Sequence, residues 1–339
     1  MTSPPAVSVI IPALNAELYI ADTLTCLRHQ GLSADELEVI VVDDGSTDST
    51  AEIVESRRPE FPGMQMIRKP KPGGLPAARN SGMSASTGRH ITFIDSDDWF
   101  ADGHLRVMLD AIETLGVDFV RTDVIRATGK TRKLMTAPVS LRARALNTKD
   151  FIVDGFAATM VDFPNAFAGL YRRELWESGI LAFDESLLSA EDREWNWRVF
   201  LEAETFAVVD SPGPVYRRNV PTSITAVYDE RQLCFIDSCQ ASIEQTLDRE
   251  EFRDFTIKAG HNLMALADIH LQRKSEMTRE IQHELIDRTA RAAAKLPEDD
   301  WTAILASMKP ERRRRLAPII RRTLRHRKQL VAGSDGRTS

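Results

Sequence analysis

Carboxylates gather at two places where a strand is expected to end. One pair closes the apolar run EVIVVDD, and a second group follows the apolar run HITFID. These carboxylates are Asp43, Asp44, Asp95, Asp97 and Asp98. Like charges a few ångströms apart raise one another's pKa, and a bound cation relieves that repulsion. A hard divalent ion, Mg²⁺ or Mn²⁺, binds one or two carboxylates together with phosphate oxygens of a substrate, so the pattern indicates metal-assisted phosphate chemistry. Taken alone, the same residues are also typical of turns that follow a strand.

A glycine-rich stretch from Gly73 to Gly82 contains one arginine, Arg79. Glycines let the backbone approach a ligand closely, and a guanidinium makes charge-assisted hydrogen bonds to phosphate. The stretch matches neither Gly-x-Gly-x-x-Gly nor a Walker loop, so it contains no nucleotide motif of known mechanism. Tight packing of a loop and a small-residue helix explains the same glycines equally well.

Two further carboxylates, Glu191 and Asp192, open a helix that the sequence predicts over residues 191–203. The N-terminal end of a helix favours the ionised form of an acidic side chain, and a general base must be ionised before it accepts a proton. Acidic residues in a first helical turn also serve as caps, so this pair needs independent support before it is assigned to catalysis.

Strands and helices alternate through the first part of the chain and would position these groups. Four apolar runs predict strands, namely 7–11, 38–44, 65–69 and 90–95. Helical patterns lie between them and over residues 102–115. Such alternation is typical of βαβ units, so we predict an α/β fold: a mostly parallel sheet with helices on both faces.

The 339 residues are enough for one large domain with an appendage, or for two domains. The alternation fades before residue 228, and from residue 229 onward the apolar residues follow helical spacing. We therefore predict an α/β domain over 1–228, a helical domain over 229–330 and a disordered end over 331–339. The helical segment could also supply a contact in a homo-oligomer.

Features of secreted and membrane-spanning proteins are missing from the sequence. Three cysteines without a Cys-x-x-Cys pair exclude a disulfide scaffold and a structural zinc site. The N-terminus has no basic region before its short apolar run, unlike a signal peptide. No stretch approaches the roughly 20 apolar residues that span a bilayer. We therefore expect a cytoplasmic protein that is at most peripheral at the inner face of the membrane.

Charge is unevenly distributed along the chain. The formal net charge is -6, yet residues 309–339 have 11 basic and 2 acidic side chains, a net charge of +9. An acidic body does not indicate a nucleic-acid partner, so none is expected. The basic end needs an explanation of its own.

Residues 309–328 predict a basic amphipathic helix. Its apolar stripe consists of Leu316, Ile319, Ile320 and Leu324. Pro318 is expected to kink this helix or to start a new one. Three explanations stay open: contact with an anionic membrane, packing of the stripe on the protein itself, and recruitment of an anionic acceptor.

Five motifs together resemble those of the family 2 glycosyltransferases with the GT-A fold. They are VSVIIPALNAE, VVDDGSTDST, GGLPAARNSG, FIDSDD and SAEDREW, in this order, and the resemblance covers residues 6 to about 225. It implies transfer of a hexose or N-acetylhexosamine from a nucleoside diphosphate sugar, commonly UDP-linked, with inversion and with Mn²⁺ or Mg²⁺. The expected acceptor is a glycan, a polyol phosphate or a lipid-linked sugar in cell-surface polysaccharide synthesis. The Gln-x-x-Arg-Trp motif of processive members is absent.

The resemblance assigns roles around the nucleotide. Pro12, Ala13 and Asn15 match the loop that borders the nucleotide in this family. Asp44 matches the carboxylate that contacts the uracil edge, and Asp43 is its neighbour.

The resemblance also assigns the donor and metal positions. Arg79 matches a basic residue near the donor. Asp95 and Ser96 match the start of the Asp-x-Asp-Asp region that contacts the ribose, and Asp97, with Asp98 as the alternative, matches the metal ligand.

Asp192 matches the catalytic base of the family. The sequence departs from the family pattern in the later segment VYRRNVPTSIT, which lacks the histidine with which many members hold the metal or the diphosphate. Arg217, Arg218 and Ser223 are available there, and an arginine can hold a diphosphate but cannot ligate a metal.

Two other functions stay open at this point. A nucleotidyltransferase uses a similar sheet and metal, but it needs a glycine-rich loop with a basic residue after the first strand, where this chain has PALNAE. A nucleotide-sugar-binding protein without turnover would not require a base, so the presence of both Asp97 and Asp192 argues against it.

Overall fold

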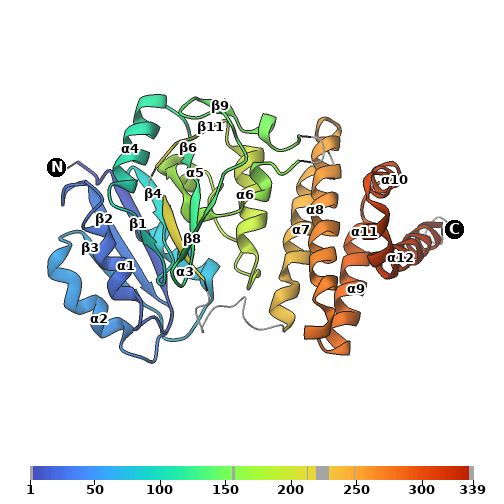
Figure 1. Ribbon diagram of the computed structural model, residues 1–339, viewed down its shortest axis with the longest axis horizontal. Coiled ribbons are helices and arrows are strands. Elements are labelled where there is room, and N and C mark those ends of the chain that lie inside the picture. Colours follow the sequence, from blue (N-terminus) through green and yellow to red (C-terminus); the bar gives the residue numbers. More distant parts are fainter. Residues whose placement is uncertain (1–2, 155–156, 212, 219–228, 248, 336–339) are drawn as a thin grey trace. The chain divides into compact units, whose positions relative to one another are not determined.

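The computed structural model of the chain describes residues 3–154, 157–211, 213–218, 229–247 and 249–335 (Figure 1). The chain forms two compact units. One comprises Met1–Leu188 with Trp195–Ser223, and the other Ser189–Glu194 with Ile224–Ser339. The predicted boundary after residue 228 adjoins residues 219–228, which lie outside the described residues, so that boundary stays a prediction.

An eight-stranded sheet forms the centre of the first unit, in the order β3-β2-β1-β4-β10-β6-β11-β9. Its strands are β1 (Val7–Ala13), β2 (Leu37–Asp43), β3 (Met64–Arg68), β4 (His90–Phe93), β6 (Phe119–Arg121), β9 (Leu146–Asn147), β10 (Gly169–Arg172) and β11 (Thr205–Val208). The strands β1 to β4 are mutually parallel, whereas β10 is antiparallel to both of its neighbours. Every residue of β1 and β2 is buried, as their continuous apolar runs require. The predicted α/β fold is confirmed.

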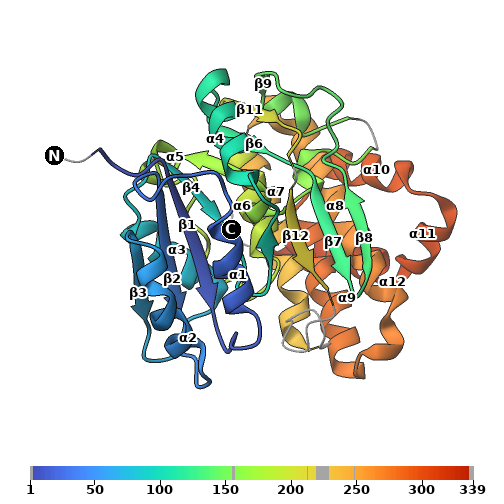
Figure 2. The ribbon, with the colours of Figure 1, turned by 60° about the vertical axis from the view of Figure 1, so that its left-hand side comes forward.

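Helices cover both faces of this sheet (Figures 1 and 2). They are α1 (Ile20–Leu27), α2 (Thr50–Arg57), α3 (Leu75–Ala85), α4 (His104–Leu115), α5 (Arg173–Glu177) and α6 (Glu191–Glu202). Alternate residues of a strand point to opposite faces. Accordingly, Val39 and Val41 of β2 share a core with α1, α2 and α4, whereas Ile40 and Val42 pack against α3.

The small residues of α3 permit this helix to approach the sheet closely. A Cβ atom on Gly82 would lie 2.4 Å from Cγ2 of Ile10 in β1, a distance that no real contact allows. Close packing of the helix on the sheet therefore explains Gly82, in agreement with the packing explanation given for the glycine-rich stretch in the sequence analysis.

A second, four-stranded sheet has the order β5-β12-β7-β8. Its strands are β5 (Trp99–Phe100), β7 (Val124–Thr128), β8 (Thr131–Met135) and β12 (Pro214–Arg217). β12 is parallel to β7 and antiparallel to β5. Because β5 directly follows Asp98, this small sheet fixes the chain just after the second group of carboxylates.

The second unit is helical. Its helices are α7 (Cys234–Leu247), α8 (Arg253–Gln272), α9 (Arg279–Ala294), α10 (Glu298–Ser307), α11 (Pro310–Arg315) and α12 (Ala317–Asp335). The pairs α7 with α8, α8 with α10, and α9 with α12 pack together. α12 includes residues 331–335 of the end that was predicted to be disordered, and residues 336–339 lie outside the described residues.

The basic amphipathic segment forms α11 and α12. Pro318 stands in the first turn of α12, so it starts a new helix, one of the two outcomes expected for it. Leu316 and Ile319 are fully buried, whereas Leu324 is 44% exposed. Arg315 pairs with the buried Asp268 at 2.7 Å. Part of the stripe is therefore core of this unit, and no helix among the described residues is long and apolar enough to cross a membrane.

Candidate active site

The loops that follow β1 and β2 are hydrogen-bonded to each other. Asn15 adopts a left-handed conformation (φ 49°), which asparagine tolerates. Its amide donates to Oγ of Ser46 at 3.0 Å, and its side-chain oxygen accepts the amide of Thr47 at 2.9 Å. The amide of Asp44 donates to the carbonyl of Ala13 at 2.8 Å. The structure thus brings together the predicted nucleotide residues Pro12, Ala13, Asn15, Asp43 and Asp44.

The two carboxylates at the end of β2 have different surroundings. Asp43 is fully buried and lies 3.1 Å from Nε of Arg68. Asp44 accepts the amides of Gly73 at 2.9 Å and Gly74 at 2.8 Å. The glycine-rich stretch therefore does bring its backbone close to another group, and that group is Asp44. The predicted contact of Asp44 with a uracil edge stays a prediction.

Arg79 joins the glycine-rich stretch to the second group of carboxylates. Its guanidinium is 1% exposed, lies 3.1 Å from Oδ1 of Asp95 and stands over the ring of Phe183 at 5.0 Å. Burial of an arginine requires a charged partner, which Asp95 provides. Two motifs separated in sequence therefore meet at the end of β4.

Residues 95–98 form a turn, here called the carboxylate turn, which the amide of Asp98 closes by donating to the carbonyl of Asp95 at 3.0 Å. Burial, followed by the charge of Asp95, raises the pKa of Asp97 to about 6. Burial, followed by the charges of Asp95 and Asp97, also raises the pKa of Asp98 well above its usual value. The turn therefore concentrates negative charge in a poorly solvated place.

The carboxylate turn fits a divalent cation that completes its shell with other oxygens. Oδ2 of Asp98 is buried with no hydrogen-bond partner among the described residues. Among the residues that the structure describes, no three His, Cys, Asp or Glu side chains lie close enough together to hold a metal by themselves. Mg²⁺ and Mn²⁺ commonly bind through one or two carboxylates, with water and substrate phosphate as further ligands. Asp97 and Asp98 match that requirement.

Arg217, at the end of β12, holds the carboxylate turn. Its amide donates to Oδ1 of Asp98 at 2.6 Å, and its Nε donates to the carbonyl of Asp97 at 2.8 Å. The guanidinium lies between the rings of Tyr19 at 4.8 Å and Trp99 at 4.9 Å. The sequence predicted that Arg217 binds a diphosphate. In the structure Arg217 is hydrogen-bonded to the carboxylate turn.

The other predicted residues of that segment have separate outcomes. Arg218 donates its amide to the carbonyl of Ala127 at 2.8 Å and its guanidinium to the hydroxyl of Tyr216 at 3.1 Å. Ser223 lies outside the described residues. Binding of a diphosphate by this segment stays a prediction.

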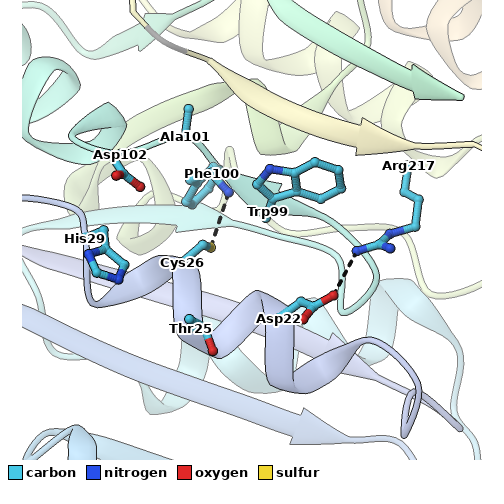
Figure 3. Close-up of a pocket in the computed structure, with 9 residues that line it drawn as sticks. All are labelled: Asp22, Thr25, Cys26, His29, Trp99, Phe100, Ala101, Asp102 and Arg217. Carbon is cyan, nitrogen blue, oxygen red and sulfur yellow. Dashed lines mark hydrogen bonds and ion pairs between the residues drawn. The ribbon is translucent and has the colours of Figure 1, made fainter. Parts of the chain in front are cut away.

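A cavity of about 630 Å³ lies beside the turn, between α1 and β5 (Figure 3). Asp22, Trp99 and Arg217 are among its lining residues, and Arg217 lies 3.4 Å from Asp22. Cys26 also lines it, but burial raises the pKa of this thiol to about 12, so Cys26 is not a nucleophile at neutral pH.

Asp192 stands in the first turn of α6, beside the buried Glu191. The residue before this pair, Ala190, has a left-handed conformation (φ 56°). From Trp195 onward the same helix belongs to the first unit, where Trp195 stacks on Phe183 at 5.1 Å. Residues 189–194 belong to the second unit, and the role of Asp192 as base stays a prediction.

Comparison with known proteins assigns the family. Residues 8–177 match the family described as Glycosyl transferase family 2. The putative glycosyltransferase EpsH of Bacillus subtilis is 30% identical over 74% of this chain and 72% of its own length. This chain belongs to glycosyltransferase family 2.

Other relatives of this family 2 glycosyltransferase extend the likeness. The uncharacterized glycosyltransferase EpsJ of B. subtilis is 32% identical, and the match spans 66% of this chain but only 64% of EpsJ. The poly(ribitol-phosphate) beta-N-acetylglucosaminyltransferase TarS of Staphylococcus aureus is 29% identical over 62% of this chain and 35% of TarS. The crystal structure of TarS 1-349 matches with a TM-score of 0.72 at 19% identity, covering 97% of this chain and 92% of that one. The predicted GT-A fold with a helical C-terminal region is confirmed.

Family motifs did not reveal every residue that holds the site of this glycosyltransferase. Thr23, buried in α1, donates its hydroxyl to the carbonyls of Ser96 at 2.9 Å and Asp98 at 2.7 Å. Trp99 faces the guanidinium of Arg217. A lone threonine in an amphipathic helix has no local signature of such a contact, because the partner lies 75 residues away. The tryptophan directly after Asp98 was the one visible signal.

Proposed function

We propose that this glycosyltransferase transfers a hexose or N-acetylhexosamine from a UDP-linked donor to an acceptor hydroxyl, with inversion and with Mn²⁺ or Mg²⁺ at the carboxylate turn. The observation that best supports a metal is the buried Oδ2 of Asp98, which has no hydrogen-bond partner among the described residues. A TarS structure described as a complex with UDP-GlcNAc shares the fold, with a TM-score of 0.72, which supports a UDP-linked donor.

The residues of the turn divide the work in this proposal. Asp97 and Asp98 would hold the cation, which when bound neutralises charge on the departing diphosphate. Asp95, paired with Arg79, would contact the ribose. Arg217 and Thr23 hold the backbone of the turn, so the carboxylates need little rearrangement when the donor binds.

Asp192 would accept the proton of the acceptor hydroxyl. One base and an attack from the face opposite the leaving diphosphate give inversion without a covalent sugar-enzyme intermediate. Relatives named for poly(ribitol-phosphate) glycosylation and for minor teichoic acid biosynthesis support an acceptor from cell-surface polymers, whether a glycan, a polyol phosphate or a lipid-linked sugar.

The experiment that tests this function measures UDP released from a panel of UDP-sugars by the full chain. We expect at least one donor to be turned over with Mn²⁺ and turnover to stop with EDTA. Release of UDP at the same rate in EDTA would contradict the metal, and no release from any donor would contradict the choice of UDP.

Peripheral membrane contact through residues 309–328 also stays a proposal. Because Leu316 and Ile319 are buried, contact would depend on exposed basic side chains, of which Arg321, Arg325 and Lys328 belong to α12. We expect replacement of these three by glutamine to reduce co-sedimentation with anionic liposomes. Equal sedimentation of the wild-type protein and the variant would reject contact through α12.

A further inference from the structure

A basic cavity of about 420 Å³ lies beside the carboxylate turn. Its lining includes the aromatic side chains of Tyr19 and Trp99 and the guanidinium groups of Arg132, Arg217 and Arg218. The lining residues that the structure describes include no carboxylate. Three guanidinium groups therefore meet in one concave place without an acidic wall.

The charges of these arginines are poorly matched within the protein. The guanidinium of Arg132 donates to the carbonyls of Gly129 at 3.0 Å and Thr131 at 3.3 Å, and it has no carboxylate partner in the described part of the chain. Arg218 donates to the hydroxyl of Tyr216. Each guanidinium has five N–H donors, so donors remain for a ligand.

Among the described residues, Arg217 is the arginine of this cavity that has acidic neighbours. Its amide donates to Oδ1 of Asp98 in the carboxylate turn at 2.6 Å, and its guanidinium lies 3.4 Å from Asp22, whose side chain is 68% exposed. Water screens exposed ion pairs, so Asp22 offsets the charge of the Arg217 guanidinium only weakly. An anion with several oxygens would satisfy all three guanidiniums. Arginine binds both carboxylate and phosphate, and a phosphate group has more oxygens to share among three guanidiniums than a carboxylate has.

Aromatic rings hold two of the arginines in position. Trp99 lies beneath the guanidinium of Arg132 at 5.7 Å and that of Arg217 at 4.9 Å. Tyr19, directly before α1, contacts Arg217 at 4.8 Å. Cation–π contacts of this kind restrain long side chains before a ligand arrives, which favours binding.

The cavity reaches the carboxylate turn through its backbone. The guanidinium of Arg217 contacts Asp97 at the carbonyl oxygen, which leaves the carboxylate of Asp97 available to the donor. A ligand in the cavity would therefore bind next to the reaction site without using the proposed metal ligands.

We propose that this cavity binds a phosphate group of the acceptor, which makes the acceptor a phosphate-bearing molecule. The proposal rests on the proposed transferase function and names the substrate class that the same site accepts. Arg132 is the residue that tests it, because its side chain is exposed on β8, it lines the cavity, and it has no contact with the carboxylate turn.

The test is calorimetric titration of glycerol phosphate into the full chain, with and without saturating UDP and Mn²⁺. A charge-assisted hydrogen bond contributes roughly 1.5–3 kcal/mol, so we expect Arg132→Gln to weaken glycerol phosphate binding about tenfold or more. UDP affinity should stay unchanged in this variant. Lys133→Gln is the matched control, because the next residue of a strand points to the opposite face, and it should bind glycerol phosphate like the wild type.

Two results would overturn the proposal. Equal glycerol phosphate binding by wild type and Arg132→Gln would show that the cavity binds no phosphate through Arg132. Loss of UDP affinity in Arg132→Gln, to the same extent as loss of glycerol phosphate affinity, would assign the cavity to the donor diphosphate. If UDP does not bind at all, the proposed donor is wrong, and the titration without UDP still decides the cavity.

Discussion

Replacing Asp97 with asparagine should make the metal-free protein more stable at pH 8. In the folded protein, burial and the charge of Asp95 raise the pKa of Asp97 from 3.8 to about 6. Each unit of pKa difference between the folded and unfolded chain corresponds to about 1.4 kcal/mol, so folding disfavours the charged form of Asp97 by about 3 kcal/mol. Partial contact with water reduces this to about 2 kcal/mol, since Asp97 is only half-buried. For a unit of this size the expected rise in Tm is about 4–8 °C.

The pH dependence gives the sign of the effect. Because the pKa of Asp97 is higher in the folded than in the unfolded chain, folding takes up a proton between pH 3.8 and about 6. The destabilisation of the wild type is therefore complete above about pH 7 and disappears as the pH falls toward 4. The difference in Tm between Asp97→Asn and the wild type should be large at pH 8 and small at pH 4.5.

Thermal unfolding in EDTA, followed by circular dichroism at both pH values, measures this difference. The control is Asp102→Asn, which removes a nearby exposed carboxylate and should change Tm little at either pH. A Tm of Asp97→Asn equal to or below that of the wild type at pH 8 would refute the claim that burial of the Asp97 carboxylate, together with the charge of Asp95, destabilises the fold.

Three other predictions follow from the geometry. Asp192→Asn should keep its affinity for UDP and lose about 10²–10⁴-fold in sugar transfer, because the base is removed; near wild-type transfer would reject the base. Thr23→Val should lower the free energy of unfolding by about 1–3 kcal/mol and weaken Mn²⁺-dependent UDP binding, since the carbonyls of Ser96 and Asp98 lose their donor; Thr25→Val, exposed on the same helix, should do neither, and equal behaviour of the two variants would argue against the role of Thr23. Gly82→Ala should cost about 1–3 kcal/mol of stability because its Cβ would meet Ile10; denaturant titration measures the change, and an unchanged midpoint would contradict the close packing.

The strands that the sequence revealed are those with strong local patterns. β1 and β2 are continuous apolar runs, and they are buried throughout. β8 was not predicted, because the sequence TRKLM is mostly exposed and has no apolar face to recognise. The antiparallel insertion of β10 between β4 and β6 depends on pairing between distant segments, which no local pattern contains.

The residues of the site also differ in whether the sequence could reveal their contacts. Motif order was enough to predict that Arg79 and the carboxylates after β4 belong to one site. The hydrogen bond from Arg217 to Asp98 joins residues 119 apart, so its geometry could not be read from spacing. The apolar stripe over residues 316–324 has the same sequence pattern in a membrane helix and in a helix packed on the protein. The pairing of Arg315 with the buried Asp268 could not be read from the sequence, because Asp268 lies in a distant segment.

Calorimetric binding of UDP to the full chain tests the central claim most directly, because that claim is a donor bound through a cation at the carboxylate turn. We predict UDP binding in Mn²⁺ that weakens at least about tenfold in EDTA and to a similar extent in Asp97→Asn, since a charged ligand contact is lost. UDP affinity that is unchanged by both EDTA and Asp97→Asn would contradict it.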